Sequence, residues 1–200
     1  MEVFSTLRDS DIFEVPYAEP KEYKIRPTAK GIVIDGEGNI ALLEARSHFL
    51  FPGGGVEEGE SNEEAFTREC MEEIGCRIKI THGLGTAIQY RAASAKKYEI
   101  YFYVAMVVGE KGAPTTTSKG ELACLLSWQS EEEVKKILEY QWKRIPKDDY
   151  PSQFNTRSHC AAFEKYLSEK VSDTTKLNSS SSSFNFLDNE PERYTAKDLI

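Results

Sequence analysis

The sequence predicts an α/β protein in which a mixed β-sheet is flanked by helices. Strand-like runs stand before and after one well-capped central helix, and amphipathic helical patterns follow late in the chain. The length of 200 residues is enough for one domain with a hydrophobic core. We therefore expect one domain over residues 1–170, with 1–22 as an N-terminal arm, and a disordered serine-rich tail over 171–200.

The first part of the chain supplies short strands. Residues 1–22 are mixed in character and predict an irregular arm or a short edge strand. Strand-like runs follow at 26–35 and 40–46, and the DGEGN segment between them indicates a hairpin loop. A third short strand at 48–51 leads to the glycine run Gly53–Gly55, which we expect to be a loop because glycine permits unusual backbone angles and close approaches.

The central helix is predicted to begin at Asn62. Ser61 and Glu64 form an S-x-x-E capping box, which is typical of a helix N-terminus. Gly75 is expected near the C-cap, where glycine commonly ends a helix. One side of this helix is apolar and would pack on the sheet: Ala65, Phe66, Cys70 and Ile74.

The same helix carries three glutamates on one face. Glu69, Glu72 and Glu73 are spaced i, i+3 and i+4, so their side chains project together and repel one another. A bound cation would remove that repulsion, and hard cations such as Mg²⁺ and Mn²⁺ prefer carboxylate oxygens together with water and substrate phosphate. The plainer alternative is a solvated acidic face, which is the usual meaning of a glutamate run.

The chain after the helix alternates between strands, a loop and helices. Ser130 and Glu133 form a second capping box, which predicts the start of another helix. Five consecutive serines, Ser179–Ser183, have the composition of a flexible linker. The expected elements are strands at 76–91, 97–108 and 121–128, a loop at 109–120, and helices at 131–141 and 153–169.

The composition limits which partners the protein is expected to bind and in which cellular compartment it is expected to occur. The net charge of −8 argues against binding a nucleic acid polymer, but a divalent metal could still recruit a nucleotide. The four cysteines are widely spaced and predict reduced cytosolic thiols instead of a zinc site or disulfides. No apolar run reaches the ~20 residues of a membrane span, and the first residues lack signal-peptide character. We expect a cytoplasmic protein that does not enter a membrane.

The segment from Gly54 to Cys76 reads G-x5-E-x7-R-E-U-x-E-E-x-G-U, where U is a bulky apolar residue. This pattern resembles the signature of the Nudix hydrolases, the MutT-like family. Every charged and glycine position is met, and cysteine at both U positions, Cys70 and Cys76, affects only the expected packing. The resemblance covers about residues 25–170. It implies the Nudix α/β/α sandwich, with the signature forming a loop–helix–loop at one end of the sheet.

The resemblance also implies a reaction and a set of roles. Nudix hydrolases cleave a nucleoside diphosphate linked to another moiety, X, by attack of water on phosphorus with Mg²⁺ or Mn²⁺ bound. By position, Glu69 and Glu73 would be the principal metal ligands, with Glu72 in the first shell or just behind it. Glu60 could bind metal directly or through water. Arg68 would pair with a signature glutamate and hold it in place.

Two residues are candidates for the general base. Glu69 could activate the attacking water itself. Many relatives instead use an acid in a loop before a strand that ends in tryptophan, and Glu121 stands seven residues before Trp128 here. A solvent-exposed loop glutamate is an equally good interpretation of Glu121.

Substrate contacts must come mostly from outside the signature. Gly53–Gly55 would shape the loop beside the phosphate chain, and Arg46 is a further candidate at the end of its strand. Tyr90 and Arg91, like the neighbouring Lys96 and Lys97, could contact base or phosphate, or could be a solvated hairpin end. The marks of several Nudix subfamilies are missing or incomplete, so the nucleobase and X stay open.

Three functions remain distinct at this point. The favoured one is a metal-dependent pyrophosphohydrolase acting on a small nucleotide, possible as a homodimer because Nudix relatives often are. A second is a catalytically silent nucleotide sensor with the same fold, although such proteins usually lose signature glutamates. A third is an interaction protein whose acidic charge and serine-linked tail recruit partners.

Overall fold

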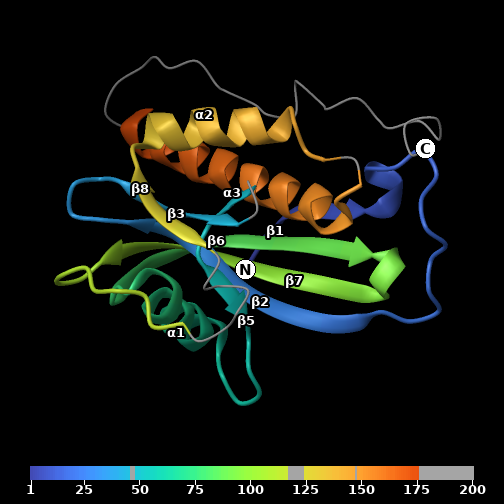
Figure 1. Cartoon of the computed structure of the whole chain (residues 1–200), viewed down its shortest axis with the longest axis horizontal. Coiled ribbons are helices and arrows are strands. Elements are labelled where there is room, and N and C mark those ends of the chain that lie inside the picture. Colours follow the sequence, from blue (N-terminus) through green and yellow to red (C-terminus); the bar gives the residue numbers. More distant parts are fainter. Residues whose placement is uncertain (46–47, 117–123, 147, 176–200) are drawn as a thin grey trace.

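The computed structural model describes residues 1–45, 48–116, 124–146 and 148–175. These residues form an α/β sandwich in which helices cover both faces of a mixed β-sheet (Figure 1). The predicted fold class is therefore confirmed. None of the described helices is long and apolar enough to cross a membrane.

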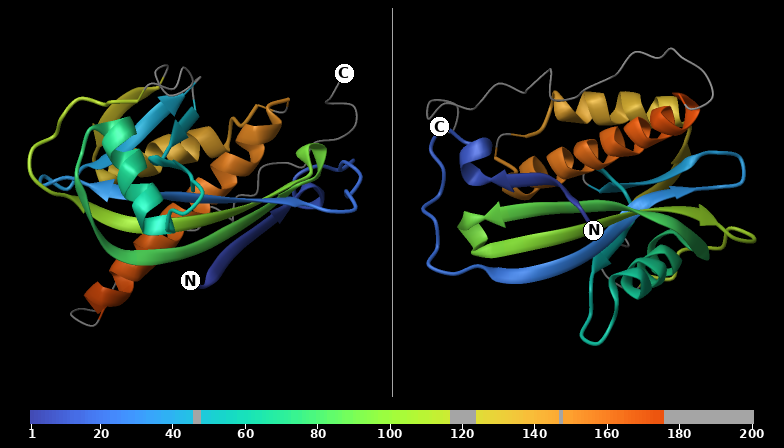
Figure 2. Two further views of the ribbon diagram at one scale, coloured as in Figure 1. Left: turned by 90° about the horizontal axis from the view of Figure 1, so that it is seen from below. Right: turned by 180° about the vertical axis from the view of Figure 1, so that it is seen from behind.

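Eight strands of the described chain form one sheet in the order β1-β6-β7-β2-β3-β4, with β5 pairing β2 and β8 pairing β3. The pairs β1–β6 and β2–β7 are parallel and the other pairs are antiparallel. Figure 2 shows the long strands β2, β6 and β7 side by side through the centre. The strand bounds are β1 Val3–Arg8, β2 Lys24–Ile34, β3 Ile40–Ala45, β4 His48–Leu50, β5 Gly53–Gly55, β6 Ile78–Arg91, β7 Lys96–Val107 and β8 Leu125–Gln129.

Within the described residues, three α-helices flank this sheet, with short 3₁₀ turns at Asp9–Asp11 and Ala92–Ser94. Helix α1 (Asn62–Ile74) lies on one face, and α2 (Glu131–Trp142) and α3 (Tyr150–Thr175) lie on the other. The start and end of α1 agree with the sequence prediction.

Helix α3 is longer than predicted at both ends. It begins at Tyr150, so Pro151 falls in its first turn. Proline is tolerated there because the N–H that it lacks would have no helical partner. It continues to Thr175, past the predicted end at 169 and past the predicted domain boundary at 170. The predicted tail is thus helical over residues 171–175, and residues 176–200 lie outside the described chain.

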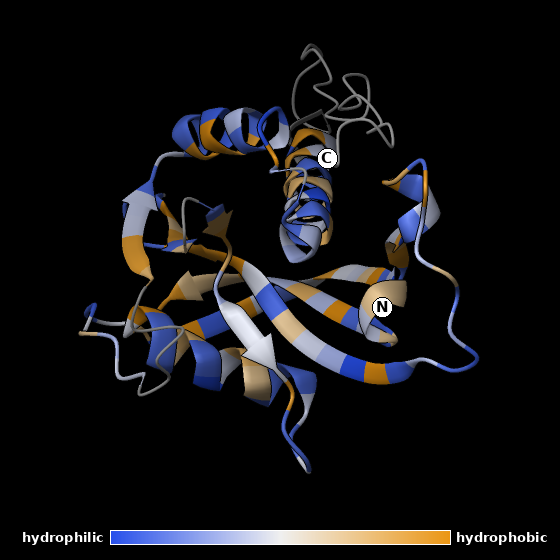
Figure 3. Ribbon diagram, turned by 45° about the vertical axis from the view of Figure 1, so that its right-hand side comes forward, coloured by the Kyte–Doolittle hydropathy of each residue, from blue (hydrophilic) through white to orange (hydrophobic). Residues whose placement is uncertain are grey.

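Buried hydrophobic residues form two layers, one under α1 and one under α2 and α3. Figure 3 shows hydrophobic and hydrophilic segments alternating along the helices and strands. The layer under α1 contains the predicted apolar side of that helix, all of it buried: Ala65, Phe66, Cys70 and Ile74. The layer under α2 and α3 includes Ile32, Leu42, Phe51, Phe102, Val134, Leu138, Phe163 and Tyr166. All four cysteines are free thiols, as their spacing predicted.

The structure decides between the two alternatives for the N-terminal arm, and it corrects the prediction for the glycine run. The arm contains β1, which pairs with β6 in parallel, so the edge-strand alternative is correct. The glycine run predicted as a loop is the short strand β5, antiparallel to Thr28–Lys30 of β2. The prediction was wrong because β3 pairs with β2 only near its end, at Ile34, and leaves the earlier edge of β2 for the glycines.

Candidate active site

Helix α1 is fixed at both ends by local chemistry. Ser61 Oγ accepts a hydrogen bond from the Glu64 amide at 3.2 Å, and the Glu64 carboxylate accepts one from the Ser61 amide at 2.8 Å. Both halves of the predicted capping box are therefore present. Gly75 ends the helix with φ 65° and ψ 25°, a left-handed conformation that favours glycine. The acidic face is thus held on a helix with defined ends.

Arg68 lies at the centre of the charged cluster. Its Nε and Nη2 donate to the two carboxylate oxygens of Glu60 at 2.9 and 3.0 Å. Its Nη1 donates to Glu69 Oε1 at 2.9 Å and lies 3.5 Å from Glu72 Oε2. The bonds to Glu60 raise the pKa of the Arg68 guanidinium and lower the pKa of the Glu60 carboxyl. This geometry agrees with the pairing role that the family resemblance implied for Arg68.

Strand β5 closes over the carboxylates of α1. The Gly53 amide donates a hydrogen bond of 2.7 Å to Glu73 Oε2. A Cβ placed on Gly54 would lie 2.3 Å from Glu69 Oε1, so only glycine allows this backbone to approach the carboxylate so closely. Arg68 Nη2 also donates to the Gly55 carbonyl at 3.0 Å. All three glycines therefore contact the charged cluster, although as a strand instead of a loop.

The donor chemistry of this cluster suits a hard divalent cation, because Glu69, Glu72 and Glu73 offer carboxylate oxygens from one helix face. Across the described residues, no group of three or more His, Cys, Asp or Glu side chains converges closely enough to hold a metal ion. Glu69 is bonded to Arg68 and Glu73 to the Gly53 amide. Glu60 has both oxygens on Arg68, so metal binding there would compete with that pair.

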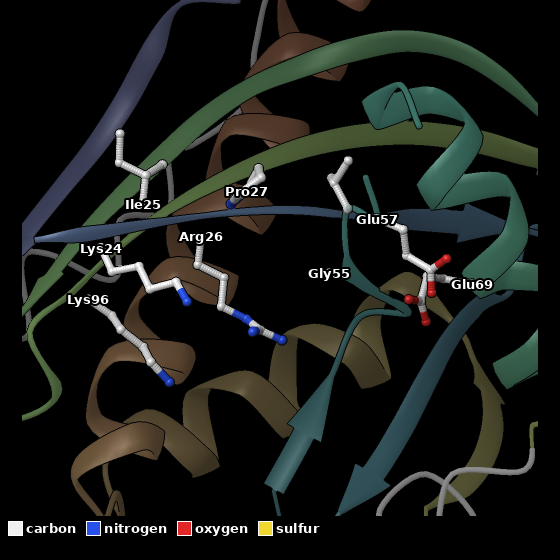
Figure 4. Close-up of a pocket in the computed structure, with 9 residues that line it drawn as sticks. Lys24, Ile25, Arg26, Pro27, Gly55, Glu57, Glu69 and Lys96 are labelled. Carbon is white, nitrogen blue, oxygen red and sulfur yellow. The ribbon is translucent and has the colours of Figure 1, made fainter. Parts of the chain in front are cut away.

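A pocket of about 510 Å³ opens beside this cluster (Figure 4). This volume is within the roughly 300–1,000 Å³ usual for small-molecule sites. Acidic residues occupy one end and basic residues the other, as Figure 4 shows. The lining residues are Lys24, Ile25, Arg26, Pro27, Gly55, Val56, Glu57, Glu69 and Lys96.

The sequence prediction missed two of the three cations in this pocket. Lys96 was a candidate, whereas Lys24 and Arg26 were not considered. The alternation of charge around Ile25 at the start of β2 was the available signal. It carried little weight alone, because only the parallel pairing of Lys24 with Lys96 shows that the cations share a site.

Tyr90 and Arg91 do not line the pocket. Arg91 is 7% exposed, and it donates to Gln89 Oε1 at 2.8 Å and to Asn155 Oδ1 at 2.6 Å. Burial lowers the pKa of its guanidinium. The structure thus gives Arg91 a packing role between β6 and α3 instead of a place at a solvated hairpin end. The Tyr90 ring lies under Arg8, with 3.8 Å between the guanidinium carbon and the ring centroid.

Two predicted site residues cannot be placed. Arg46 and Glu121 lie outside the described residues. The choice of Glu69 or Glu121 as general base therefore remains a prediction.

The fold and the site together define an α/β sandwich whose acidic, arginine-braced helix faces a glycine strand and a charged pocket. The Nudix domain family matches residues 24–150, which is more than half of the chain. The chain therefore belongs to the Nudix family.

Individual relatives match over shorter stretches. The chain is 39% identical over 61 residues to an RNA pyrophosphohydrolase of Wolbachia pipientis subsp. Culex pipiens (strain wPip), a match covering 29% of this chain and 36% of that protein. It is 38% identical over 64 residues to the mitochondrial Nudix hydrolase 17 of Arabidopsis thaliana, covering 32% and 35%. The matches thus span only about a third of these relatives.

Solved structures support the fold. A Nudix hydrolase from Nitrosomonas europaea superposes with a TM-score of 0.55 at 19% identity, covering 74% of this chain and 91% of that one. At this identity the likeness concerns the sandwich architecture only.

Proposed function

We propose that the protein is a divalent-metal-dependent pyrophosphohydrolase that cleaves a nucleoside diphosphate linked to X. The observation that carries this proposal is the braced cluster at the pocket. Arg68 joins Glu60 to Glu69, and Gly53 and Gly54 of β5 lie directly against Glu73 and Glu69. An acidic cluster held this firmly and facing a 510 Å³ pocket suits catalysis better than a merely solvated helix face does.

Each residue of the cluster has a role in this proposal. The carboxylates of Glu69, Glu72 and Glu73 do not converge on one point in the described structure, so they would have to turn toward Mg²⁺ or Mn²⁺ to hold it. The bound ion would neutralise charge on the phosphate oxygens. Arg68 positions Glu69 and keeps Glu60 beside it. Glu69 would accept a proton from water, which its position in the pocket lining at 7% exposure supports, with Glu121 as the alternative base.

The substrate class is a small nucleotide, and the identity of X must come from experiment. Three of the matched relatives are named RNA pyrophosphohydrolase, which adds 5′-triphosphorylated RNA to the compounds that need testing. A catalytically silent sensor is the competing function, since it would use the same pocket without turnover.

The test is phosphate or pyrophosphate release from a nucleotide panel with Mg²⁺, with Mn²⁺ and with EDTA. The panel should hold normal and oxidised dNTPs, ADP-ribose, diadenosine polyphosphates, NADH, nucleotide sugars and triphosphorylated RNA. We expect metal-dependent turnover that falls by at least about a hundredfold in Glu73→Gln, since that change removes a ligand charge at nearly constant shape. Tight nucleotide binding by the wild type without turnover would establish the sensor instead.

A matched control tests whether the effect of Glu73→Gln is specific to the site. Glu132→Gln makes the same chemical change at an exposed glutamate of α2, which pairs with Lys136. Turnover should be unchanged in this variant. A loss there as large as in Glu73→Gln would show that the assay responds to charge or folding in general.

A further inference from the structure

Three cations gather at the end of the pocket away from the acidic cluster. Lys24 and Arg26 lie on the same face of β2, since alternate residues of a strand share a face. Lys96 of β7 is in register with Lys24 across the parallel pair, so it lies beside it on that face. Figure 4 shows all three side chains extending to the same side. Within the described part of the chain, none of the three forms an ion pair.

This cationic end is continuous with the catalytic end. A Cβ placed on Gly55 would lie 3.5 Å from Arg26 Nη2, so the guanidinium lies beside the glycine strand. Gly55 pairs with Thr28, and Lys24 is four residues earlier on the same strand. At about 3.3 Å per residue, Lys24 is about 13 Å along β2 from that pairing. One extended ligand can therefore reach both ends of the pocket.

The lining suits recognition of charge better than recognition of a base. None of the nine described lining residues is aromatic, so none of them offers a ring that could stack on a nucleobase. The chain as a whole carries a charge of −8, so a group of three unpaired cations is not an average surface property. A partly enclosed site with this much positive charge favours an anion and attracts it over a distance.

We propose that Lys24, Arg26 and Lys96 bind a second phosphate of the substrate. This phosphate is attached to the ribose of the nucleoside and is separate from the scissile pyrophosphate. The substrate class is thus a pyrophosphate whose nucleoside bears a further phosphate on its ribose. This inference rests on the proposed function, because it assumes that the pyrophosphate lies at the acidic end.

The test uses substrate pairs that differ only by that phosphate. Suitable pairs are NADPH and NADH, ADP-ribose 2′-phosphate and ADP-ribose, and coenzyme A and dephospho-coenzyme A. A separate comparison of triphosphorylated pppApA with ATP, which differ by a whole nucleotide, tests a phosphodiester as the alternative source of the charge. In the wild type we expect kcat/KM to be about tenfold higher or more for the member with the extra phosphate, since charge-assisted hydrogen bonds are strong. Lys24→Ala/Lys96→Ala should bring the ratio of the two kcat/KM values close to one.

Lys79→Ala is the matched control. Lys79 pairs with Met106 of β7, which is in register with Ile34, ten residues along β2 from Lys24. The same charge is removed far from the pocket, so the preference should survive. The preference of the wild type should also weaken with added salt, as expected for an attraction between partly exposed charges.

The possible outcomes distinguish failure of the second-phosphate site from failure of the proposed pyrophosphohydrolase function. Metal-dependent hydrolysis with equal kcat/KM within every pair overturns the second-phosphate site and leaves the pyrophosphohydrolase intact. If no compound is hydrolysed, the proposed function fails, and calorimetric binding of the same pairs then decides about the site. Tighter binding of the extra-phosphate member, lost in Lys24→Ala/Lys96→Ala, supports it, whereas equal binding overturns it.

Discussion

Arg68 shows how one side chain organises an acidic cluster. Its planar guanidinium donates to Glu60, to Glu69 and to the Gly55 carbonyl, so it links the start of α1, the acidic face and β5. A lysine could not make this set of bonds, because it has one nitrogen in place of a fork. The like charges of Glu69 and Glu72 are partly offset by the same guanidinium.

At the residue scale, Gly54→Ala should disrupt the site. The added Cβ would lie 2.3 Å from Glu69 Oε1 and 2.5 Å from its carboxyl carbon, so the carboxylate must move. A displacement of that size at a catalytic group can cost roughly a hundredfold in rate. Steady-state kinetics of the metal-loaded enzyme measures this effect.

Gly36→Ala is the control for that substitution. A Cβ on Gly36 meets nothing within 4 Å, so kcat and the melting temperature should stay close to wild type. Wild-type turnover in Gly54→Ala would mean that the contact between Gly54 and Glu69 does not matter for catalysis.

At the scale of elements, α3 fixes the segment that leads into β5. The Phe51 amide, between β4 and β5, donates a hydrogen bond of 3.0 Å to His159 Nδ1 on α3. The Phe51 ring stacks on the imidazole, with 5.3 Å between the ring centroids. Helix α3 therefore helps to position the glycines that contact Glu69 and Glu73, although it contributes no residue to the pocket lining.

This contact predicts a dependence of stability on pH. Burial, with a contribution from the charge of Lys30, holds the pKa of His159 well below 6.5, so the folded protein keeps the imidazole neutral. The unfolded chain binds that proton once the pH falls below about 6.5, so folding stability decreases as the pH is lowered. One such group costs at most about 1.4 kcal/mol per pH unit, or roughly 2 kcal/mol between pH 6.5 and 5.

His159→Asn provides the comparison, because its side-chain oxygen can still accept from the Phe51 amide. We expect it to be less stable than wild type at neutral pH by roughly 2 kcal/mol through lost packing. This difference in the free energy of unfolding between wild type and variant should shrink by a similar amount at about pH 5. Urea unfolding at neutral pH and at the lower pH measures it. A difference that stays constant with pH would rule out a neutral buried His159 as the cause of the pH-dependent stability.

At the scale of the molecule, the sheet separates two apolar layers and places the site at the edge of β2. Helix α1 is packed on one face through Phe66 and Ile74, while α3 is packed on the other through Phe163 and Tyr166. The last turns of α3 still contact the fold, because Tyr166 donates to Glu131 at 3.1 Å and Lys170 pairs with the same carboxylate.

These contacts predict where the chain can be shortened. A protein that ends at Thr175 should keep its melting temperature and turnover, since every described contact is retained. A protein that ends at Lys165 loses Tyr166, which is 7% exposed, and should be destabilised by about 3 kcal/mol or more. Thermal unfolding and the nucleotide assay measure both effects. Loss of turnover in the longer protein would instead favour the interaction role for residues 176–200.

The sequence by itself determined the features that depend on local spacing. The capping box at Ser61, the stop at Gly75 and the common face of Glu69, Glu72 and Glu73 all follow from bonds and angles within one helix. The order of strands and helices and the apolar side of α1 follow from periodicity in the same way.

Only the tertiary structure decided which distant segments share a site. Pairing of β2 with β7 brings Lys24 to Lys96, and pairing of β2 with β5 turns the glycine run into a strand. Packing of β6 on α3 buries Arg91, which the sequence alone left as a pocket candidate. The physical reason is that strand pairing depends on which edges are free in the folded sheet, and residue spacing carries no information about that.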